Sequence, residues 1–548
     1  MRAGKNEKRS VKGRVFPLCA AAVLAVILVL CAVLSSDAFS RYTAAGACFW
    51  FAAVMALYVF RPGSWLNSFP ASEVSLKHNL ITLAAQIALI LVCVLPMSLS
   101  PIWNGEVPDH RNEYEVMADS LLEGHLYLDY DDVDPKLLTM ENPYDPEARQ
   151  AEGVTVHWDH AWYNGHYYMY FGVVPAVITF LPYRVLTGHA LTTYHATQLY
   201  VMLMILGFFA LFQELADRFY RRLPFGTYLL LSLAAGAISS WYCAEAPALY
   251  CTAISAGLFL EVWSLFFFIR AAFVISSEKK RVACAAAGAL LGALAFGCRP
   301  PVALGNLLAL GLMISCLKGK KPSRKLSAGI FAAILPYIIV GAALMWYNWA
   351  RFQNPFEFGQ TYQLTVADQH SYASEFYGSG FLVMFLDIVG NFFDFAGFNE
   401  TFPYIGFNGA FLNFPIFFLI LILLDRQVMR GVRKDGIAGF VLGLAVTPVI
   451  VTAVDAAWTP FLMERYRLDI YYLLSILTFI AAAAAHRDLK DRCARRVLWI
   501  SDILGVMALV GSFLLFLVPN DCNITALYPE ISDTMRRILL FFLNTITA

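Results

Sequence analysis

Long apolar runs recur along almost the whole of this chain, and they limit what it can fold into more than any other feature. A run of about 20 apolar residues is long enough to cross the hydrocarbon core of a bilayer as a helix. Lipid tolerates only backbones whose hydrogen bonds are satisfied internally, so the runs predict an all-α, polytopic transmembrane helix bundle of about 13 spans. The predicted spans are 15–35, 43–60, 79–100, 196–217, 226–242, 247–270, 283–298, 301–317, 327–349, 406–424, 437–457, 468–485 and 497–517.

Composition supports the bilayer as the main solvent. Of the 548 residues, 59% are hydrophobic and 15% are charged, against about 45–50% and about 25% in soluble domains. These values exclude a disordered chain and argue against a soluble enzyme. The 40 basic residues balance the 40 acidic ones, which argues against a nucleic-acid partner. The cysteines show no metal-ligand spacing, and the sequence indicates no cofactor.

The distribution of Lys and Arg predicts the orientation of the spans. The N-terminal tail up to Arg14 is basic and precedes a long first run without a cleavage site, so we expect an uncleaved span and a cytoplasmic N-terminus. Five later basic loops also fall inside if 170–187, which contains Pro175 and Pro182, does not cross the membrane fully but forms a tilted or re-entrant half-helix. The chain is then a multi-pass plasma-membrane protein built as one integral domain. Its extracytoplasmic segments are 101–169, 350–405 and the tail 518–548.

Segment 101–169 differs from the rest because it is rich in carboxylates, histidines and aromatic rings. After Asn112 and Glu115, which resemble a capping box, it predicts a helix that ends at Gly124. One apolar stripe at helical spacing predicts that this helix lies on the outer interface. The stripe consists of Tyr114, Met117, Ala118, Leu121 and Leu122. Segment 350–405 is expected mainly to cap the outer face of the bundle, with a second interfacial helix in its later half.

An outward loop with an acidic residue, followed by such a helix, resembles the GT-C class of integral membrane glycosyltransferases. That class includes lipid A aminoarabinose transferases and protein O-mannosyltransferases. One departure is Tyr170-Phe171-Gly172, which stands where the class has Lys-Pro-Pro. The residues that carry the resemblance are Asp109, Tyr114, Ala118, Leu121 and Gly124, together with the later segments NGHYYMYFGVVPAVITFLPYRVLTG, AFGCRPP, YNWARFQNPFEFGQTYQL and ERYRLDIYY.

The resemblance implies a hexosyl- or pentosyltransferase that moves a sugar from a polyprenyl-phosphate donor to an extracytoplasmic acceptor. An acceptor hydroxyl loses its proton as it attacks the anomeric carbon, so a carboxylate base is needed within hydrogen-bond reach. The departing lipid phosphate needs cationic stabilisation. A single displacement inverts the anomeric configuration, as in inverting glycosidases, with the acceptor in place of water.

Asp109 is the first candidate for the base, because it precedes the interfacial helix just beyond a span. Glu113 is the second candidate, since the class places its acid about four residues before the tyrosine and His110 occupies that position here. Asp159 is the third. It lies between His157 and His160. These three residues could ligate a metal or make ordinary polar contacts at the membrane interface, and their spacing favours the polar contacts.

Substrate contacts are expected from these loops and from cations at the outer ends of spans. The loop candidates are His110, Arg111, Asp159 and His160. The candidates for the donor phosphate are Arg299, Arg351, Arg465, Tyr466 and Arg467. For each arginine the alternative is snorkelling to lipid headgroups.

Two other functions stay open. A multi-span transporter or flippase would use broken helices at the bilayer midplane and repeated halves, and no repeat is evident. An envelope polysaccharide polymerase or ligase would also act outside the membrane. The expected partners are the lipid-linked donor, membrane lipids and an acceptor that is a glycan, lipid or protein; the sequence names neither sugar nor acceptor.

Overall fold

The structure is a computed structural model of the chain. It describes residues 50, 53–61, 63–73, 75–94, 113–245, 249–275, 277–317, 324–369, 380–458, 462–518 and 529–547.

Eight helices in the described ranges are long and apolar enough to cross a membrane. The chain is therefore an integral membrane protein, and the predicted all-α polytopic bundle is confirmed, whereas the predicted number of spans is not. The eight are Leu76–Val94 (α3), Thr193–Phe219 (α7), Phe225–Glu245 (α8), Leu249–Ile269 (α9), Arg324–Phe352 (α13), Ala438–Trp458 (α18), Leu468–Asp488 (α19) and Asp491–Phe516 (α20).

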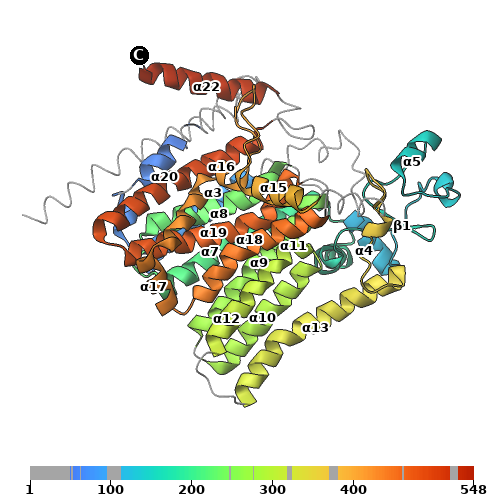
Figure 1. Ribbon diagram of the computed structural model, residues 1–548, viewed down its shortest axis with the longest axis horizontal. Helices are drawn as coiled ribbons and strands as arrows, with labels where there is room; N and C mark the ends of the chain where they lie inside the picture. The colour runs from blue at the N-terminus through green and yellow to red at the C-terminus, as the bar shows by residue number, and fades with distance from the viewer. Residues whose placement is uncertain are drawn as a thin grey trace, which may run out of the picture.

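Helix α19 forms the centre of the bundle, and α13 lies at its edge (Figure 1). Every residue from Leu468 to Ala485 is buried, as expected for a helix that is apolar on all sides. In α13, by contrast, Ile338 and Ile339 are each 57% exposed. Apolar side chains of this kind face lipid, which is their solvent in a membrane.

Shorter elements complete the bundle and its ends. The helices are Glu278–Phe296 (α10), Pro300–Ala303 (α11), Leu307–Leu317 (α12), Gly380–Phe393 (α15), Ala410–Asn413 (α16), Arg426–Lys434 (α17) and Pro529–Thr547 (α22). The 3₁₀ turns include Trp65–Ser68 (η1), Leu304–Asn306 (η6), Gln360–Tyr362 (η7), Pro415–Leu424 (η8) and Glu464–Arg467 (η9), and a π-helical turn, Arg270–Val274 (η5), extends α9. In Figure 1, α22 lies apart from the bundle.

Several predicted spans are irregular. The run predicted over 301–317 is interrupted by η6, where the Asn306 side chain donates to the carbonyls of Gly292 and Ala303 at 2.9 and 2.8 Å. The run predicted over 406–424 forms α16 and the ten-residue 3₁₀ helix η8 instead of one regular helix. Segment 170–187 forms a π-helical turn, Ala176–Phe180 (η4), and α6, Leu181–Thr187. At about 1.5 Å per residue, these two are too short to span a core of about 30 Å.

Two predicted spans near the N-terminus lie wholly or partly outside the described residues. The predicted span 15–35 lies outside them, and 43–60 is described only at residue 50 and from 53 onward. The second predicted interfacial helix is present as α15. Its apolar side chains are largely exposed, including Phe381 (78%) and Leu382 (67%).

The described part of segment 101–169, the first predicted outward loop, folds into a small unit with its own core. It contains α4 (Glu113–Glu123), a 3₁₀ turn at Pro135–Leu138 (η3), α5 (Pro146–Glu152), and an antiparallel hairpin of β1 (Ala161–Tyr163) and β2 (His166–Tyr168). Asn164 and Gly165 form the turn with φ of 49° and 82°. Positive φ at both central residues is typical of a type I′ turn, whose twist matches the strands it joins.

Helix α4 begins and ends where the sequence predicts, and most of its predicted stripe is buried. Tyr114, Met117 and Ala118 are at most 2% exposed, whereas Leu122 is 52% exposed. The Glu115 side chain accepts a hydrogen bond at 3.1 Å from the backbone N–H of Thr193, the first residue of α7; Asn112, its partner in the predicted capping box, lies outside the described residues. The loop unit is therefore fastened to a membrane helix.

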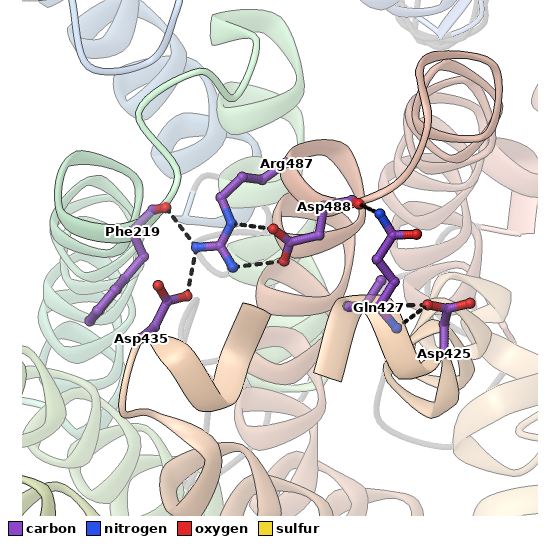
Figure 2. A network of polar contacts seen from close by, with 7 residues as sticks. Phe219, Asp425, Gln427, Asp435, Arg487 and Asp488 are labelled. Carbon is purple, nitrogen blue, oxygen red and sulfur yellow. Dashed lines mark hydrogen bonds and ion pairs between the residues drawn. The ribbon is translucent and has the colours of Figure 1, made fainter. Parts of the chain in front are cut away.

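The opposite end of the bundle is held together by a network around Arg487, shown in Figure 2. The guanidinium donates to both carboxylate oxygens of Asp488 (2.8 and 2.7 Å), to Asp435 (2.6 Å) and to the carbonyl of Phe219 (3.1 Å). The Gln427 side chain donates to the backbone carbonyl of Asp488. These bonds join the ends of α7, α17 and α19.

Candidate active site

A buried ion pair marks the other end of α19. Arg299 stands between α10 and the Pro300-Pro301 start of α11, which requires an extended residue at this position. Its Nε and Nη2 form a two-pronged pair with the Asp469 carboxylate at 2.6 to 2.9 Å. Asp469 lies in the first turn of α19, where the helix dipole favours a negative charge. Among the described residues, Nη1 of Arg299 has no hydrogen-bond acceptor.

Arg465 lies close to this pair and is bound differently. Its guanidinium carbon lies 4.1 Å from the ring centre of Tyr250 and 5.6 Å from that of Tyr466. The Arg299 guanidinium is 5.3 Å from the same Tyr466 ring. No carboxylate of the described residues lies within ion-pair distance of Arg465. Two cations therefore share one aromatic ring, and one of them has no anionic partner in the described part of the chain.

Tyr250 connects these cations to the first outward loop. Its hydroxyl donates to Oδ2 of Asp159, and the Gln363 side chain donates to Oδ1 at 3.1 Å. Asp159 is 7% exposed and has a φ of 61°, a left-handed conformation that Asp tolerates better than most residues. The predicted site residues Asp159, Arg299, Arg465 and Tyr466 thus come together, with Tyr250 between them.

Glu113 and His160 form a second buried pair behind Asp159. His160 Nδ1 lies 3.2 Å from Oε1 of Glu113, and both side chains are fully buried. Nδ1 donates to the carbonyl of Trp158 at 2.9 Å, so Nε2 accepts from the Tyr130 hydroxyl at 2.8 Å. Burial lowers the pKa of His160 to about 3, which leaves the ring neutral at pH 7.

The Glu113 carboxyl has a perturbed acidity. Burial raises its pKa well above the ordinary value, the negative charge of Asp159 raises it further, and Arg351 opposes both effects. Neither carboxyl oxygen has a hydrogen bond of good geometry from a described residue. A carboxyl group of this kind, next to a second carboxylate and near cations, is typical of functional sites.

The remaining predicted arginines bind backbone carbonyls. Arg351 is 5% exposed and donates at 2.6 Å to the carbonyl of Met169, which directly follows β2. Its guanidinium also lies 3.9 Å from the ring centre of Tyr347. Arg467 is 8% exposed and donates to the carbonyl of Phe407 at 3.4 Å. Both hold the backbone near the site.

The second outward loop builds one wall of the site. Leu364 exchanges backbone hydrogen bonds with this region: its N–H donates to His160 O at 2.8 Å, and its carbonyl accepts from Asp159 N–H at 3.0 Å. Ala161 and Gln363 form a β-bridge. Segment 350–405 therefore does more than cap the bundle, because it positions Asp159.

The His157 and His160 rings of the predicted HWDH cluster lie with their centres 5.4 Å apart, but their nitrogens have separate partners and do not meet around a metal position. His157 pairs with Asp132 at 2.9 Å, whereas Asp159 points to Tyr250 and Gln363. The group of described residues with metal-ligand geometry is Glu123, His125 and Asp129, whose ligand atoms lie within 4.8 Å of one another. Two of these three side chains are exposed. This group is where a small cation would find oxygen and nitrogen ligands.

Three predicted site residues, Asp109, His110 and Arg111, lie outside the described residues. Conversely, Tyr250, Gln363 and Tyr130 complete the site and were not predicted. Tyr250 follows a short break between two apolar runs, which was a weak signal for an outer helix end. Nothing in the sequence pointed to Gln363 or Tyr130.

Comparison with known proteins gives limited information. No protein-family model matches the chain, and no curated protein matches it. Two crystal structures of the Archaeoglobus fulgidus oligosaccharyltransferase are similar at low level. The apo form has 12% identity and a TM-score of 0.43 over 78% of this chain, and the form tethered to an acceptor peptide has 11% and 0.42 over 79%. The matches cover 56% and 54% of that enzyme, so the chain spans about half its length. At these values the likeness does not establish a shared fold.

Proposed function

We propose that this protein is an integral membrane glycosyltransferase of the GT-C type, which transfers a sugar from a polyprenyl-phosphate donor to an extracytoplasmic acceptor with inversion. The observation that carries the proposal is Arg465. It is a cation without a carboxylate partner among the described residues, and it lies next to Arg299. Tyr250 contacts both Arg465 and the buried Asp159.

In this proposal the two arginines stabilise the departing lipid phosphate. Arg465 supplies a positive charge that has no ion-pair partner among the described residues, and Arg299 presents Nη1 while Asp469 fixes its orientation. Preorganised cations of this kind act where negative charge develops in the transition state, and they need no reorganisation during the reaction. Tyr250 and Tyr466 hold the Arg465 guanidinium in place by cation–π contacts.

A carboxylate of the first outward loop acts as the base that deprotonates the acceptor. Asp109 stays the first candidate and stands four positions before Glu113 in the sequence. Glu113 must ionise in order to act, and a raised pKa makes the ionised carboxylate a stronger base. Asp159 already accepts two hydrogen bonds, so we assign it to positioning Tyr250 and, through it, Arg465.

The orientation belongs to the same proposal. The network of Arg487 and the basic loops would face the cytoplasm, and the site around Arg465 would face outward, where the acceptor is a glycan, lipid or protein. A reporter fused after Glu141 should then give the extracytoplasmic signal. A cytoplasmic signal at this position would contradict the orientation.

The transporter alternative has one observation in its favour. Glu261 of α9 is fully buried, and neither carboxyl oxygen has a hydrogen-bond partner among the described residues. It faces the helix break at Gly305, where an added Cβ would lie 2.7 Å from Oε1. A buried acid beside a broken helix is typical of transport pathways, so Glu261→Gln should abolish lipid translocation in vesicles if that function is correct.

The decisive experiment measures sugar transfer from a polyprenyl-phosphate donor by the purified full-length protein. Asp109→Asn, Glu113→Gln and Asp159→Asn are compared, because removal of a general base should lower turnover by about 10²- to 10⁴-fold. Asp119→Asn is the matched control. Its carboxylate pairs with Arg184 at 2.7 Å on the far side of α4 and is 43% exposed.

The outcomes separate the candidates. Loss of turnover in only one of the Asp109 and Glu113 variants identifies the base. A smaller loss in Asp159→Asn, with weaker donor binding, is expected of a positioning residue. Normal transfer in all three variants, or no transfer by the wild-type protein from any such donor, would contradict the proposal.

A further inference from the structure

A cavity lies at the end of the bundle opposite to the candidate active site. Its volume is about 490 Å³, and it is enclosed by α3, α7 and α8, with Trp263 of α9. Gln213 of α7 lines it, 20 residues after Thr193, where the outward loop is fastened. At about 1.5 Å per residue, the cavity is about 30 Å from that contact. Its size falls within the range of about 300–1,000 Å³ that is usual for ligand sites.

The charged groups of this cavity are all acidic, and Asn79, Thr82 and Gln86 add amide and hydroxyl groups that can both donate and accept. Glu73 and Asp217 contribute carboxylates, and no lysine or arginine is among the lining residues. The Gln213 amide nitrogen donates to the Ala71 carbonyl at 3.1 Å and to Asp217 at 2.8 Å. Both amide protons are therefore used, and the Gln213 amide oxygen is left as an acceptor.

His78 adds an acceptor that no described residue satisfies. The side chain is 4% exposed, and its Nδ1 lies 2.8 Å from the backbone carbonyl of Glu73. A carbonyl only accepts, so Nδ1 carries the proton and the neutral ring leaves Nε2 as an acceptor. Nε2 is buried without a hydrogen-bond partner. The ring itself is fixed between Phe69 and Phe225, at centroid distances of 5.1 and 4.6 Å.

The walls between these acceptors are aromatic. Phe225, Tyr228 and Trp263 line the cavity together with Phe209. Aromatic faces and carboxylates attract the same kind of ligand, namely a cation. An anion such as phosphate would meet two carboxylates and no positive charge. A compact cation with N–H donors, in contrast, would meet the carboxylates of Glu73 and Asp217 and the amide oxygen of Gln213.

From these contacts we infer that the cavity between α3, α7 and α8 is a binding site for a primary ammonium group. The lipid-facing side of α3 shows how such a group would arrive, because Leu76, Leu80 and Leu83 are 50% to 76% exposed. An aminophospholipid could place its acyl chains along these residues and its ethanolamine ammonium in the cavity. A free alkylamine offers the same ammonium chemistry without the chains. The site is independent of the sugar-transfer proposal.

The test titrates the full-length protein in detergent with short-chain phosphatidylethanolamine, phosphatidylcholine and phosphatidylglycerol, and measures bound lipid by native mass spectrometry. The site variant is Glu73→Gln/Asp217→Asn, which removes both charges at the cavity and keeps His78 and the aromatic walls. The matched control is Glu278→Gln/Asp491→Asn. It removes the same charge from two positions outside the cavity, half-buried Glu278 on α10 and exposed Asp491 on α20.

We expect phosphatidylethanolamine to bind more tightly than the other two lipids, and its Kd to rise about tenfold in the site variant but not in the control. Phosphatidylcholine should bind less tightly because its quaternary ammonium has no N–H to donate. Free ethanolamine is added as a competitor: if it displaces the lipid at equal concentration, the ligand is a free amine, and if it does not, the ligand is the lipid. Equal binding of phosphatidylethanolamine and phosphatidylglycerol, or an unchanged Kd in the site variant, would overturn the inference.

Discussion

The two ends of α19 each carry an arginine network, and the two networks differ in whether their charges are satisfied. At one end, Arg487 donates to two carboxylates and a backbone carbonyl. At the other end, Arg299 has one carboxylate partner, and Arg465 has only tyrosine rings among the described residues. A saturated network holds helices together. A network in which one cation has no carboxylate partner among the described residues is suited to bind an anionic ligand, since the surrounding rings already offset the desolvation of its charge.

The largest effect that follows from this difference concerns Arg465. Arg465→Gln should lower sugar transfer by about 10²- to 10³-fold, which is the usual effect of removing one preorganised electrostatic stabiliser. The thermal midpoint should change little, because no carboxylate in the described ranges loses its partner. Turnover and unfolding are measured on the same preparation. If the Arg465 variant unfolds at lower temperature but transfers sugar normally, Arg465 stabilises the fold as Arg487 does, and the two ends of α19 do not differ in function.

Arg487 should behave in the opposite manner. Arg487→Gln leaves Asp488 and Asp435 without their shared donor, so stability should fall by about 1–3 kcal/mol. Transfer per folded molecule should stay near the wild-type value, since the network lies at the far end of α19. Thermal or denaturant unfolding in detergent checks the first expectation, with Arg495→Gln on the exposed start of α20 as a control. Loss of activity without loss of stability would assign the Arg487 network a role in function.

A smaller effect, on how stability depends on pH, distinguishes the buried pair of His160 and Glu113 from both arginine networks. The pKa of His160 is about 3 in the folded protein against an ordinary 6.5, so the unfolded chain binds the proton more readily. Stability should therefore be lost as the pH falls from about 6.5 toward 3. The raised pKa of Glu113 acts in the other direction: its stabilising effect is present at low pH and is lost as the pH rises above about 4.5.

The measurement is the thermal midpoint as a function of pH. His160→Gln should flatten the decrease on the acid side, and Glu113→Gln should flatten the decrease on the alkaline side. His189→Gln, at an exposed position, is the control. An unchanged acid profile in His160→Gln would mean that the imidazole is not kept neutral by burial.

The sequence predicted the parts of this molecule that depend on local pattern. Apolar length identified α3, α7, α8, α9, α13, α18, α19 and α20, and one apolar stripe identified α4. The break at η6 escaped prediction because Asn306 satisfies the backbone through contacts that hydropathy does not encode. The hairpin was not predicted, although the sequence contains a strong signal for it: Asn164-Gly165 between aromatic residues is typical of a tight turn between two strands.

The site was predicted less completely, for a physical reason. Arg299 and Arg465 were recognisable as single charges at helix ends. Their partners depend on packing across the fold: Asp469 lies 170 residues from Arg299, and Gln363 lies 204 residues from Asp159. Whether a given charge is paired or left over is decided by these distant contacts, and no local pattern reports it.

The joining of the two outward loops has a consequence for how the protein is made. The hairpin edge at Ala161 pairs with Gln363, and the cations follow at Arg465. About 200 residues separate Ala161 from Gln363, which the ribosome adds in roughly 10–40 s at about 5–20 residues per second. For that time a nascent chain already inserted in the membrane displays an open strand edge, a feature that invites wrong pairing. Protease resistance of the hairpin is therefore expected to appear only in nascent chains that extend well past residue 364.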